Sequence, residues 1–337
     1  MTDSVNQPEW LWELLGVERF PEGGSVMVND VPLTLVGGIP RAESFVSLAQ
    51  EQTRDAFGFK WDKRDTFEGG ITGYMIQWLI EKYGPASGWL EGLAPSPVVL
   101  DAGCGAAMSG LAYFTPVIDR IRYLGADVST AVDVAARRFA ERGAQAGFIQ
   151  ADLMALPLAS ESVDLVFSEG VLHHTDDTRA ALAAVTRVLK TGGRILFYVY
   201  RRKGPVREFT DDYIRDKMQA MSAAEGWAAM EPLTKLGRVL GELNVDIDVP
   251  ESIDLLDIPA GKINLQRFFY WHVCKAFYRP EMTLDEMNHI NFDWFAPRNA
   301  HRQSAGEVKT WCEELGLSIE REVVEEAGIA IIARKAG

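Results

Sequence analysis

Between Pro97 and Tyr200 the chain alternates short apolar runs with amphipathic stretches of helical length. The apolar runs read PVVLDAG, RYLGADVS, GFIQAD, VDLVFSEG and GRILFYVY, and helical segments such as TAVDVAARRFAERG and TRAALAAVTRVLKTGG lie between the later ones. This alternation is typical of strand-helix-strand units that build a parallel sheet. Several runs end in acids and glycines. Because ligands bind at the carboxyl ends of such strands, the pattern predicts a polar site there.

The alternation stops over residues 201–297 and resumes near the C-terminus. SAGEVKTWCEELG predicts a helix that begins after Ser304, with Glu307 completing a capping box and Gly316 ending the helix. LSIEREVVEEAGIAIIARK then predicts two strands joined over residues 325–328. Residues 201–297 are therefore expected to be an insertion over the ligand edge of a sheet that the last residues complete.

These patterns predict an α/β fold with a doubly wound, mostly parallel seven-stranded sheet, a C-terminal antiparallel hairpin, a helical insertion and an N-terminal cap segment. The cap contains VMVNDVPLTLVGGIP, which predicts a short β unit, and TGYMIQWLIEKYG, which predicts a helix. The expected regions are the cap at 1–95, a ligand-binding core at 96–200, an aromatic-rich insertion on the substrate side at 201–297, and the completion of the core sheet at 298–337.

Composition narrows the classes of partner and compartment. The 48 Asp and Glu residues exceed the 34 Lys and Arg residues, which gives a net charge of −14 and argues against nucleic acid as a partner. The three cysteines are far apart, so we expect neither a disulfide framework nor a zinc site. No basic leader and no run of about 18 apolar residues is present. We therefore predict a cytoplasmic protein with no membrane contact.

The segment DAGCGAA, residues 101–107, lies where a strand should turn into a helix. Gly103 and Gly105 allow a tight turn and close approach to a ligand, and the helix that follows offers its N-terminus to an anion. A dinucleotide fingerprint requires a third glycine three residues after Gly105, and Met108 occupies that position. The segment therefore disfavours an NAD-dependent dehydrogenase.

Two further acids are expected at neighbouring strand ends. Asp127 in GADVS can accept hydrogen bonds from both hydroxyls of a ribose. Asp152 in QADLMALPL can accept a bond from an adenine amino group, while Leu153 contacts the ring. The alternative is that both acids cap helical turns.

Together these residues resemble the class I S-adenosylmethionine-dependent methyltransferases, in the branch described as the type 11 methyltransferase domain. The matching text is VVLDAGCGAA, GADVS, QADLMALPL, VDLVFSEGVLHHTDD and RVLKTGGRILFYVY. The resemblance implies S-adenosyl-L-methionine as the cofactor, with the glycine segment at its methionine end and the turn at residues 168–170 near the sulfonium. The residues implied to bind it are Asp101, Gly103, Gly105, Asp127, Val128, Asp152, Leu153, Ser168 and Glu169.

The chain departs from its resemblance in two places. Ala106 and Ala107 follow the glycine segment, where many members have glycine or a small hydroxyl residue. The first part of the chain looks like relatives that carry a zinc ribbon, but the ribbon's cysteine pairs are missing, so we expect a degenerate ribbon-like unit and no metal.

The candidate catalytic residues are His173 and His174, because imidazole is the usual proton acceptor near neutral pH. Adjacent side chains point in different directions, so at most one is expected to face the reaction centre. The alternative is structural, with one histidine packed against the sheet and the other capping the next helix.

The insertion holds nine aromatic residues between Phe268 and Phe295, and aromatic faces attract cations and exclude water. They could instead form the insertion's own core or a subunit interface. A homo-oligomer is therefore one of the alternatives. The basic segment RRKGPVR at 201–207 could meet an anionic substrate or could be a solvated turn. The predicted substrate-binding residues are Tyr200, Arg201, Tyr270, Trp294 and His301.

We therefore predict a methyltransferase that moves a methyl group to a small-molecule acceptor, with an anionic or zwitterionic metabolite as the candidate class. Nitrogen, oxygen, sulfur and carbon acceptors are all compatible with the core. The alternatives are an RNA or protein methyltransferase and a non-catalytic subunit that binds S-adenosylmethionine.

Overall fold

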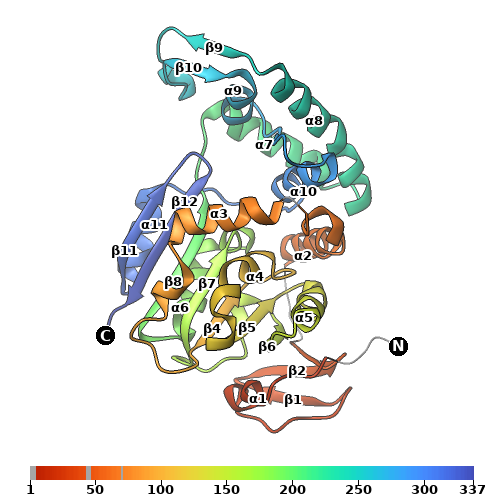
Figure 1. The fold of residues 1–337 in the computed structure, drawn as a ribbon, viewed down its shortest axis with the longest axis vertical. Coiled ribbons are helices and arrows are strands. Elements are labelled where there is room, and N and C mark those ends of the chain that lie inside the picture. The colour runs from red at the N-terminus through yellow and green to blue at the C-terminus, as the bar shows by residue number, and fades with distance from the viewer. Residues whose placement is uncertain (1–4, 43–46, 70) are drawn as a thin grey trace.

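The computed structural model describes residues 5–42, 47–69 and 71–337. Residues 1–4, 43–46 and 70 of the expected cap lie outside the described residues. The main sheet runs through the middle of the molecule (Figure 1). From one edge to the other, its described strands are β1 (Ser25–Val28), β2 (Val31–Val36), β3 (Ile39–Ala42), β6 (Ala146–Gln150), β5 (Arg122–Asp127), β4 (Val98–Ala102), β7 (Val163–Glu169), β8 (Leu189–Tyr200), β12 (Gly328–Lys335) and β11 (Leu317–Val324).

The five central strands are parallel, as the strand-helix alternation predicts. The chain first builds outward from β4 to β5 and β6, and then crosses back to add β7 and β8 on the other side. This reversal lies between β4 and β7. Open α/β sheets bind ligands beside such a reversal, at the carboxyl ends of the strands.

The C-terminal hairpin is confirmed, because β11 pairs with β12 and β12 pairs with β8, both in antiparallel register. The helix before it, α11 (Ala305–Glu314), begins with the predicted capping box. The Ser304 hydroxyl accepts from the Glu307 backbone at 3.2 Å, and the Glu307 carboxylate accepts from the Ser304 backbone at 2.7 Å. Two segments predicted from local spacing therefore have the expected structure.

The N-terminal β unit extends the same sheet, which has ten described strands where seven were predicted. Strand β3 joins the core through one parallel pair, Arg41 opposite Gln150. The Arg41 guanidinium donates to the Gln150 amide oxygen at 2.5 Å and to Asp133 at 2.7 Å. The sequence pattern predicts this β unit but does not reveal its pairing with β6, because that pairing depends on a few contacts between distant segments.

Helices cover both faces of the sheet and so confirm the doubly wound arrangement (Figure 1). Alternate residues of each strand face opposite sides: Val99 packs in one core cluster and Leu100 in the other. One face is covered by α3 (Ile71–Tyr83), α4 (Met108–Phe114) and α5 (Ala131–Glu141). The other is covered by α1 (Glu9–Leu15), α6 (Thr178–Val188) and α11. Short 3-10 helices span Arg64–Thr66, Ala86–Trp89, Thr115–Arg120, Leu153–Ala155, Leu172–His174 and Asp254–Leu256.

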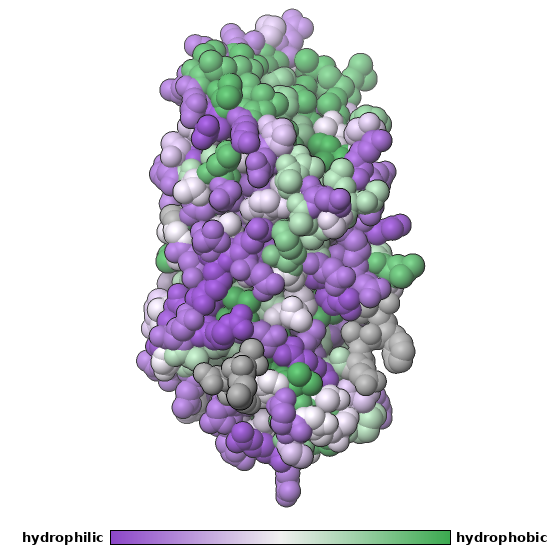
Figure 2. Space-filling view, turned by 90° about the vertical axis from the view of Figure 1, so that its right-hand side faces the viewer, coloured by the Kyte–Doolittle hydropathy of each residue, from purple (hydrophilic) through white to green (hydrophobic). Residues whose placement is uncertain are grey.

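The insertion lies beyond the carboxyl edge of the sheet, and α2 (Leu48–Trp61) and α3 lie between the two (Figure 1). A short antiparallel pair, β9 with β10, forms its far end. Figure 2 shows apolar side chains gathered at this end. The exposed apolar residues of the insertion include Val239, Leu243 and Leu255. The elements of the insertion are α7 (Pro205–Met218), α8 (Ala223–Leu243), β9 (Asp246–Val249), β10 (Gly261–Asn264), α9 (Leu265–His272) and α10 (Leu284–Phe295).

The helices of the described ranges also bear on membrane contact. None of these helices combines the length and the apolar character that crossing a bilayer requires.

Candidate active site

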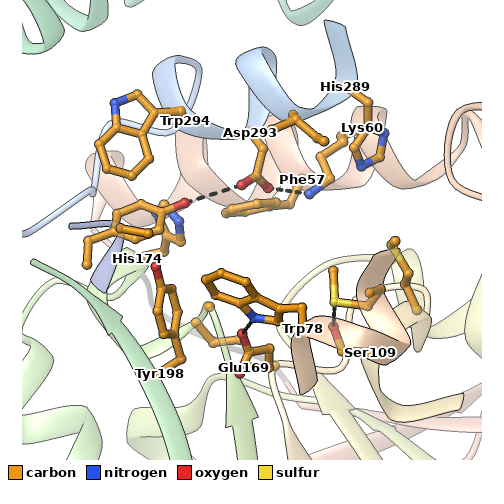
Figure 3. A pocket seen from close by; sticks show the side chains of 18 of the residues that line it. Phe57, Lys60, Trp78, Ser109, Glu169, His174, Tyr198, His289, Asp293 and Trp294 are labelled. Carbon is orange, nitrogen blue, oxygen red and sulfur yellow. Dashed lines mark hydrogen bonds and ion pairs between the residues drawn. The ribbon is translucent and has the colours of Figure 1, made fainter. Parts of the chain in front are cut away.

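A cavity of about 590 Å³ lies between the strand ends and the insertion (Figure 3). One side, the strand-tip half, is formed by the core. Its residues are Gly103, Met108, Ser109, Asp127, Val128, Asp152, Leu153, Glu169 and Gly170. The other side, the insertion half, includes Arg207, Arg267, Tyr270, Lys275, Arg279, Asp293 and Trp294. Helices α2 and α3 supply the walls between the two halves.

The glycine segment makes the tight turn that the sequence predicts. Gly103 has φ 84° and Gly105 has φ 51°, both in the left-handed region. A Cβ on Gly103 would lie 2.1 Å from a methyl carbon of Val171, so only glycine fits without displacing that side chain. Arg138 supports the turn from α5, because its guanidinium donates to the Ala106 carbonyl oxygen.

Asp127 is held at the end of β5 by three hydrogen bonds. One carboxylate oxygen accepts from the Gly105 backbone at 2.9 Å, and the other accepts from the Ser129 backbone at 2.8 Å and its hydroxyl at 2.6 Å. Burial raises the pKa of Asp127, while these bonds and the nearby Lys60 charge lower it. A carboxylate has about four acceptor positions, so Asp127 keeps one for a ligand hydroxyl. It does not cap α5, whose N-cap residue is Thr130.

Asp152 follows β6 and lies beside Leu153 in the cavity wall. One carboxylate oxygen accepts from the Met154 backbone at 2.9 Å and caps the short helix at Leu153–Ala155. In the described part of the chain, its second oxygen has no hydrogen-bond donor. Asp152 can therefore cap the turn and still accept a bond from a ligand amino group, so the two interpretations weighed from the sequence are compatible.

Glu169, at the end of β7, is fixed by α3. One carboxylate oxygen accepts from the Trp78 indole at 3.0 Å (Figure 3). The other accepts from the Tyr83 hydroxyl at 2.5 Å. Burial raises its pKa to about 7, against the lowering effect of these bonds and of Lys82. Glu169 therefore ties α3 to the strand ends, and its oxygens already have donors.

Three of the predicted cofactor residues do not line the cavity. Asp101 is buried beneath the turn, where its carboxylate accepts from the Tyr123 hydroxyl and burial raises its pKa to about 7. The Ser168 hydroxyl donates to the Ala102 carbonyl at 2.9 Å. Gly105 lies against Trp61. The structure thus assigns these residues to the support of the turn.

The two histidines have different positions. His174 lines the cavity, its Nδ1 lies 2.5 Å from the Asn299 carbonyl oxygen, and its Nε2 has no hydrogen-bond partner within the described residues. Burial lowers the pKa of His174 to about 4. His173 lies behind it, with its ring centroid 3.7 Å from that of Tyr200, and does not line the cavity. Asp177 caps α6, so neither histidine does.

The predicted substrate residues divide into two groups. Tyr200, Tyr270 and Trp294 line the insertion half, with the Tyr200 and Trp294 ring centroids 4.2 Å apart. Arg201 and His301 are exposed and do not line this cavity, so their role as substrate ligands stays a prediction. Arg201 continues the sheet edge by pairing with Gln303, and the His301 backbone donates to the His173 carbonyl at 2.9 Å. These backbone bonds leave both side chains on the surface.

The sequence does not predict the ion pair between Lys60 of α2, which is buried, and Asp293 of α10, which is partly exposed (Figure 3). The Tyr200 hydroxyl also donates to Asp293 at 3.3 Å, and the Lys60 ammonium lies 3.9 Å from the centroid of the Trp61 ring. The positive charge of Lys60 holds the pKa of Asp293 well below its usual value. Lys275, Arg267 and Arg279 were missed as well, because no local pattern indicates that they converge on one cavity.

The residues from 100 to 197 match the family described as the methyltransferase domain. The chain carries a class I S-adenosylmethionine-dependent methyltransferase domain. Among its curated relatives, the uncharacterized methyltransferase YodH of Bacillus subtilis (strain 168) is 36% identical over 114 residues, which are 32% of this chain and 46% of YodH. The malonyl-[acyl-carrier protein] O-methyltransferase of Enterobacter lignolyticus is 38% identical over 102 residues, which are 29% of this chain and 37% of that protein.

The methyltransferase domain also has structural relatives. A SAM-dependent methyltransferase from Aquifex aeolicus is 14% identical, with 79% of this chain and 98% of that chain covered and a TM-score of 0.41. The chain spans about half the length of the curated relatives that it matches in sequence. The family match covers residues 100–197 of the core, and the insertion lies outside it.

The strand-tip half of this domain fits S-adenosylmethionine by its chemistry. Asp127 and Asp152 keep acceptor positions for hydroxyl and amino groups, and Val128 and Leu153 supply an apolar wall for a base. The described residues contain no group of three or more His, Cys, Asp or Glu side chains that could hold a metal ion.

Proposed function

We propose that the protein is an S-adenosylmethionine-dependent methyltransferase that acts on a small molecule bound between the strand ends and the insertion. The observation that carries this proposal is the cavity itself. Its strand-tip half has acceptors suited to the cofactor, and its insertion half has a wall of rings and cations that no part of the core provides. In this proposal residues 201–297 are the substrate-side region.

Methyl transfer from a sulfonium is an in-line displacement, so alignment of the acceptor and exclusion of water are the main requirements. When bound, S-adenosylmethionine supplies an electrophilic methyl group. Asp127 would hold the ribose and Asp152 the adenine amino group. Tyr200 and Trp294 would exclude water from the acceptor side, since both are largely buried and both line the cavity.

His174 is the group best placed to receive a proton from an acceptor that carries one. Its Nδ1 lies against a carbonyl oxygen and is therefore the protonated nitrogen, so Nε2 is an acceptor. Because burial lowers the pKa of His174 to about 4, the ring is neutral near pH 7. A neutral imidazole can accept a proton or hold an acceptor hydroxyl by a hydrogen bond.

Two features favour a small substrate over RNA or a protein side chain: the net charge of the chain and the position of the cavity between helices. The net charge of −14 opposes a nucleic-acid backbone. Helices of the insertion and helices α2 and α3 line the cavity, so a substrate would bind between them. The three cysteines are free and buried, which supports our further proposal that the protein works in a reducing compartment such as the cytoplasm.

Calorimetric titration with S-adenosylmethionine, S-adenosylhomocysteine and NAD tests the cofactor half. We expect the first two to bind and NAD not to bind. Asp127→Ala should weaken both by about 10- to 100-fold, the equivalent of about 1 to 3 kcal/mol for a charged hydrogen bond. Asp119→Ala is the matched control, since Asp119 is exposed and lies outside the cavity. Binding of NAD alone would overturn the proposal.

A further inference from the structure

Lys275 lies in the segment between α9 and α10 and lines the insertion half of the cavity. Its exposed fraction is 6%. Within residues 5–42, 47–69 and 71–337, its ammonium has no ion pair and no hydrogen-bond acceptor, and it lies 4.5 Å from the centroid of the Trp294 ring. Burial of a lysine side chain without an anion for its ammonium is costly. The structure therefore contains a buried cation that faces a cavity and lacks a partner.

The two acids whose charges act on Lys275 are already paired with other cations. Arg207 and Asp211 of α7 form a buried ion pair at 2.8 Å. Lys60 of α2 and Asp293 of α10 form the second pair. Each pair is neutral as a unit, so neither carboxylate is left as an ion-pair partner for Lys275.

The backbone around Lys275 is fixed on both sides. The Gln266 amide donates to the Ala276 carbonyl at 2.7 Å, and the Phe277 backbone donates to the Asn291 amide oxygen at 3.0 Å. A Cβ on Gly237 of α8 would lie 2.8 Å from the Ala276 carbonyl oxygen, so the segment packs directly on that helix. Because the segment is already ordered, a ligand that meets Lys275 does not have to fix its backbone.

Two more cations share this wall. Arg267 donates to the Tyr278 carbonyl at 3.3 Å, and the Arg279 guanidinium lies 4.8 Å from the Tyr74 ring centroid. Neither forms an ion pair with an acid in the described ranges. The acids that line this side of the cavity are Asp293, paired with Lys60; Glu325, paired with Lys82; and the exposed Glu81 and Glu326.

We propose that Lys275 binds a carboxylate of the methyl acceptor, so that the substrate is an acid whose apolar body packs against the rings of Trp294 and Tyr270. This inference rests on the proposed function and deepens it. A charge-assisted bond to a carboxylate supplies the partner that the buried ammonium lacks. It also places the anionic contact on a residue outside the basic segment at 201–207, of which Lys203 and Arg207 line the same cavity.

The protonation of Lys275 provides a second way to detect carboxylate binding at this site. Burial lowers the pKa of Lys275 to about 7, with Arg207 and Lys60 also lowering it and Asp293 and Asp211 raising it. A bound carboxylate favours the charged ammonium and raises that pKa. Binding of an acid near pH 7 should therefore take up protons, which calorimetry in buffers of different ionisation enthalpy detects.

The test compares 3-phenylpropionate with its neutral amide, 3-phenylpropionamide, titrated into protein saturated with S-adenosylhomocysteine. We expect the acid to bind about 10- to 100-fold more tightly than the amide to the wild type, the range for a charged hydrogen bond. Lys275→Met should abolish that preference and Lys275→Arg should restore much of it. Lys262→Met is the matched control, because Lys262 is an exposed lysine of the same insertion. Thermal melts check that each variant is folded.

The outcomes separate the two proposals. Failure of S-adenosylhomocysteine to bind the wild type overturns the proposed function. If it binds but the wild type does not prefer the acid, or Lys275→Met keeps the preference, the carboxylate site is wrong. If Lys275→Met instead weakens S-adenosylhomocysteine, Lys275 holds the carboxylate of the cofactor and not that of the acceptor, which also overturns the inference.

Discussion

The two halves of the cavity differ in charge and in how they are built. The strand-tip half carries Asp127, Asp152 and Glu169, each at or just after the end of a strand within one continuous stretch of chain. The insertion half carries Lys275 and two arginines from the segment around α9 and α10. Acids suit a cofactor whose reactive centre is a cation, and surplus cations suit an anionic acceptor. The acids of the strand-tip half come from the core, whereas the cations that lack an acidic partner among the described residues come from the insertion.

The largest expected effect comes from breaking the strand-tip half alone. Gly103→Ala places a Cβ against Val171 at a residue with φ 84°. Overpacking and left-handed strain together should cost about 2 to 5 kcal/mol of unfolding free energy and should abolish S-adenosylhomocysteine binding. Chemical denaturation and calorimetry measure the two effects.

Two glycines serve as controls for this prediction. Gly170→Ala has a similar φ of 73° but open space around the new Cβ, so it should cost only about 1 to 2 kcal/mol. Gly241→Ala meets the Tyr278 ring in the insertion at 2.1 Å and should leave cofactor binding intact. If Gly241→Ala were as harmful to S-adenosylhomocysteine binding as Gly103→Ala, the two halves would not be separable.

A smaller effect is expected at the ion pair that links the walls of the cavity. Lys60→Met leaves the Asp293 carboxylate, 26% exposed, with only the Tyr200 hydroxyl as a donor. We expect a loss of about 2 to 3 kcal/mol, below the range for a fully buried pair because Asp293 retains some solvent. The double variant Lys60→Met with Asp293→Asn should recover at least half of this loss.

The readout is a double-mutant cycle on the free energy of unfolding. Lys63→Met is the control, since it removes a neighbouring lysine that contacts the Phe59 and Trp227 rings but no carboxylate. Additive losses in the cycle would mean that Lys60 and Asp293 do not stabilise each other, and that α2 and α10 are joined by apolar contacts alone.

The sequence predicts the core well because its signals are local. Strand-helix alternation, the capping box at Ser304 and the acids that follow β5 and β6 all depend on short spacings, and parallel topology then brings the strand ends together. The positions of Asp127 and Asp152 at one edge of the sheet are therefore predictable from the sequence alone. The pairing of β3 with β6 is not, because it depends on the long-range contact between Arg41 and Gln150.

The insertion half could not be predicted for the same physical reason. Lys60 and Asp293 meet because α2 packs against α10, and no spacing in the sequence records that packing. The basic segment after β8 is the clearest example of what the sequence cannot predict. Arg201 and Lys203 are two residues apart, yet Arg201 is exposed while Lys203 lines the cavity and donates to the Ala327 carbonyl at 2.9 Å. Composition indicates a cationic region without indicating which side chain turns inward.

The smallest expected effect comes from Asp101, which is buried beneath the glycine turn of the strand-tip half. Burial raises the pKa of Asp101 to about 7, whereas an aspartate in the unfolded chain titrates near 4. Between these values the folded protein holds one more proton than the unfolded chain, so raising the pH destabilises the fold. The stability contributed by the neutral carboxyl is complete below about pH 4 and is lost as the pH rises through about 7.

Asp101→Asn removes this titration while its amide oxygen can still accept from the Tyr123 hydroxyl. Relative to the wild type, the variant should gain about 1 to 2 kcal/mol of unfolding free energy between pH 6 and pH 8. His174, whose pKa is lowered to about 4, titrates with the opposite sign but is present in both proteins, so the difference isolates Asp101. Asp119→Asn should show no such gain. A constant difference across this pH range would mean that Asp101 is already ionised in the fold, and the turn would then rest on a charged support.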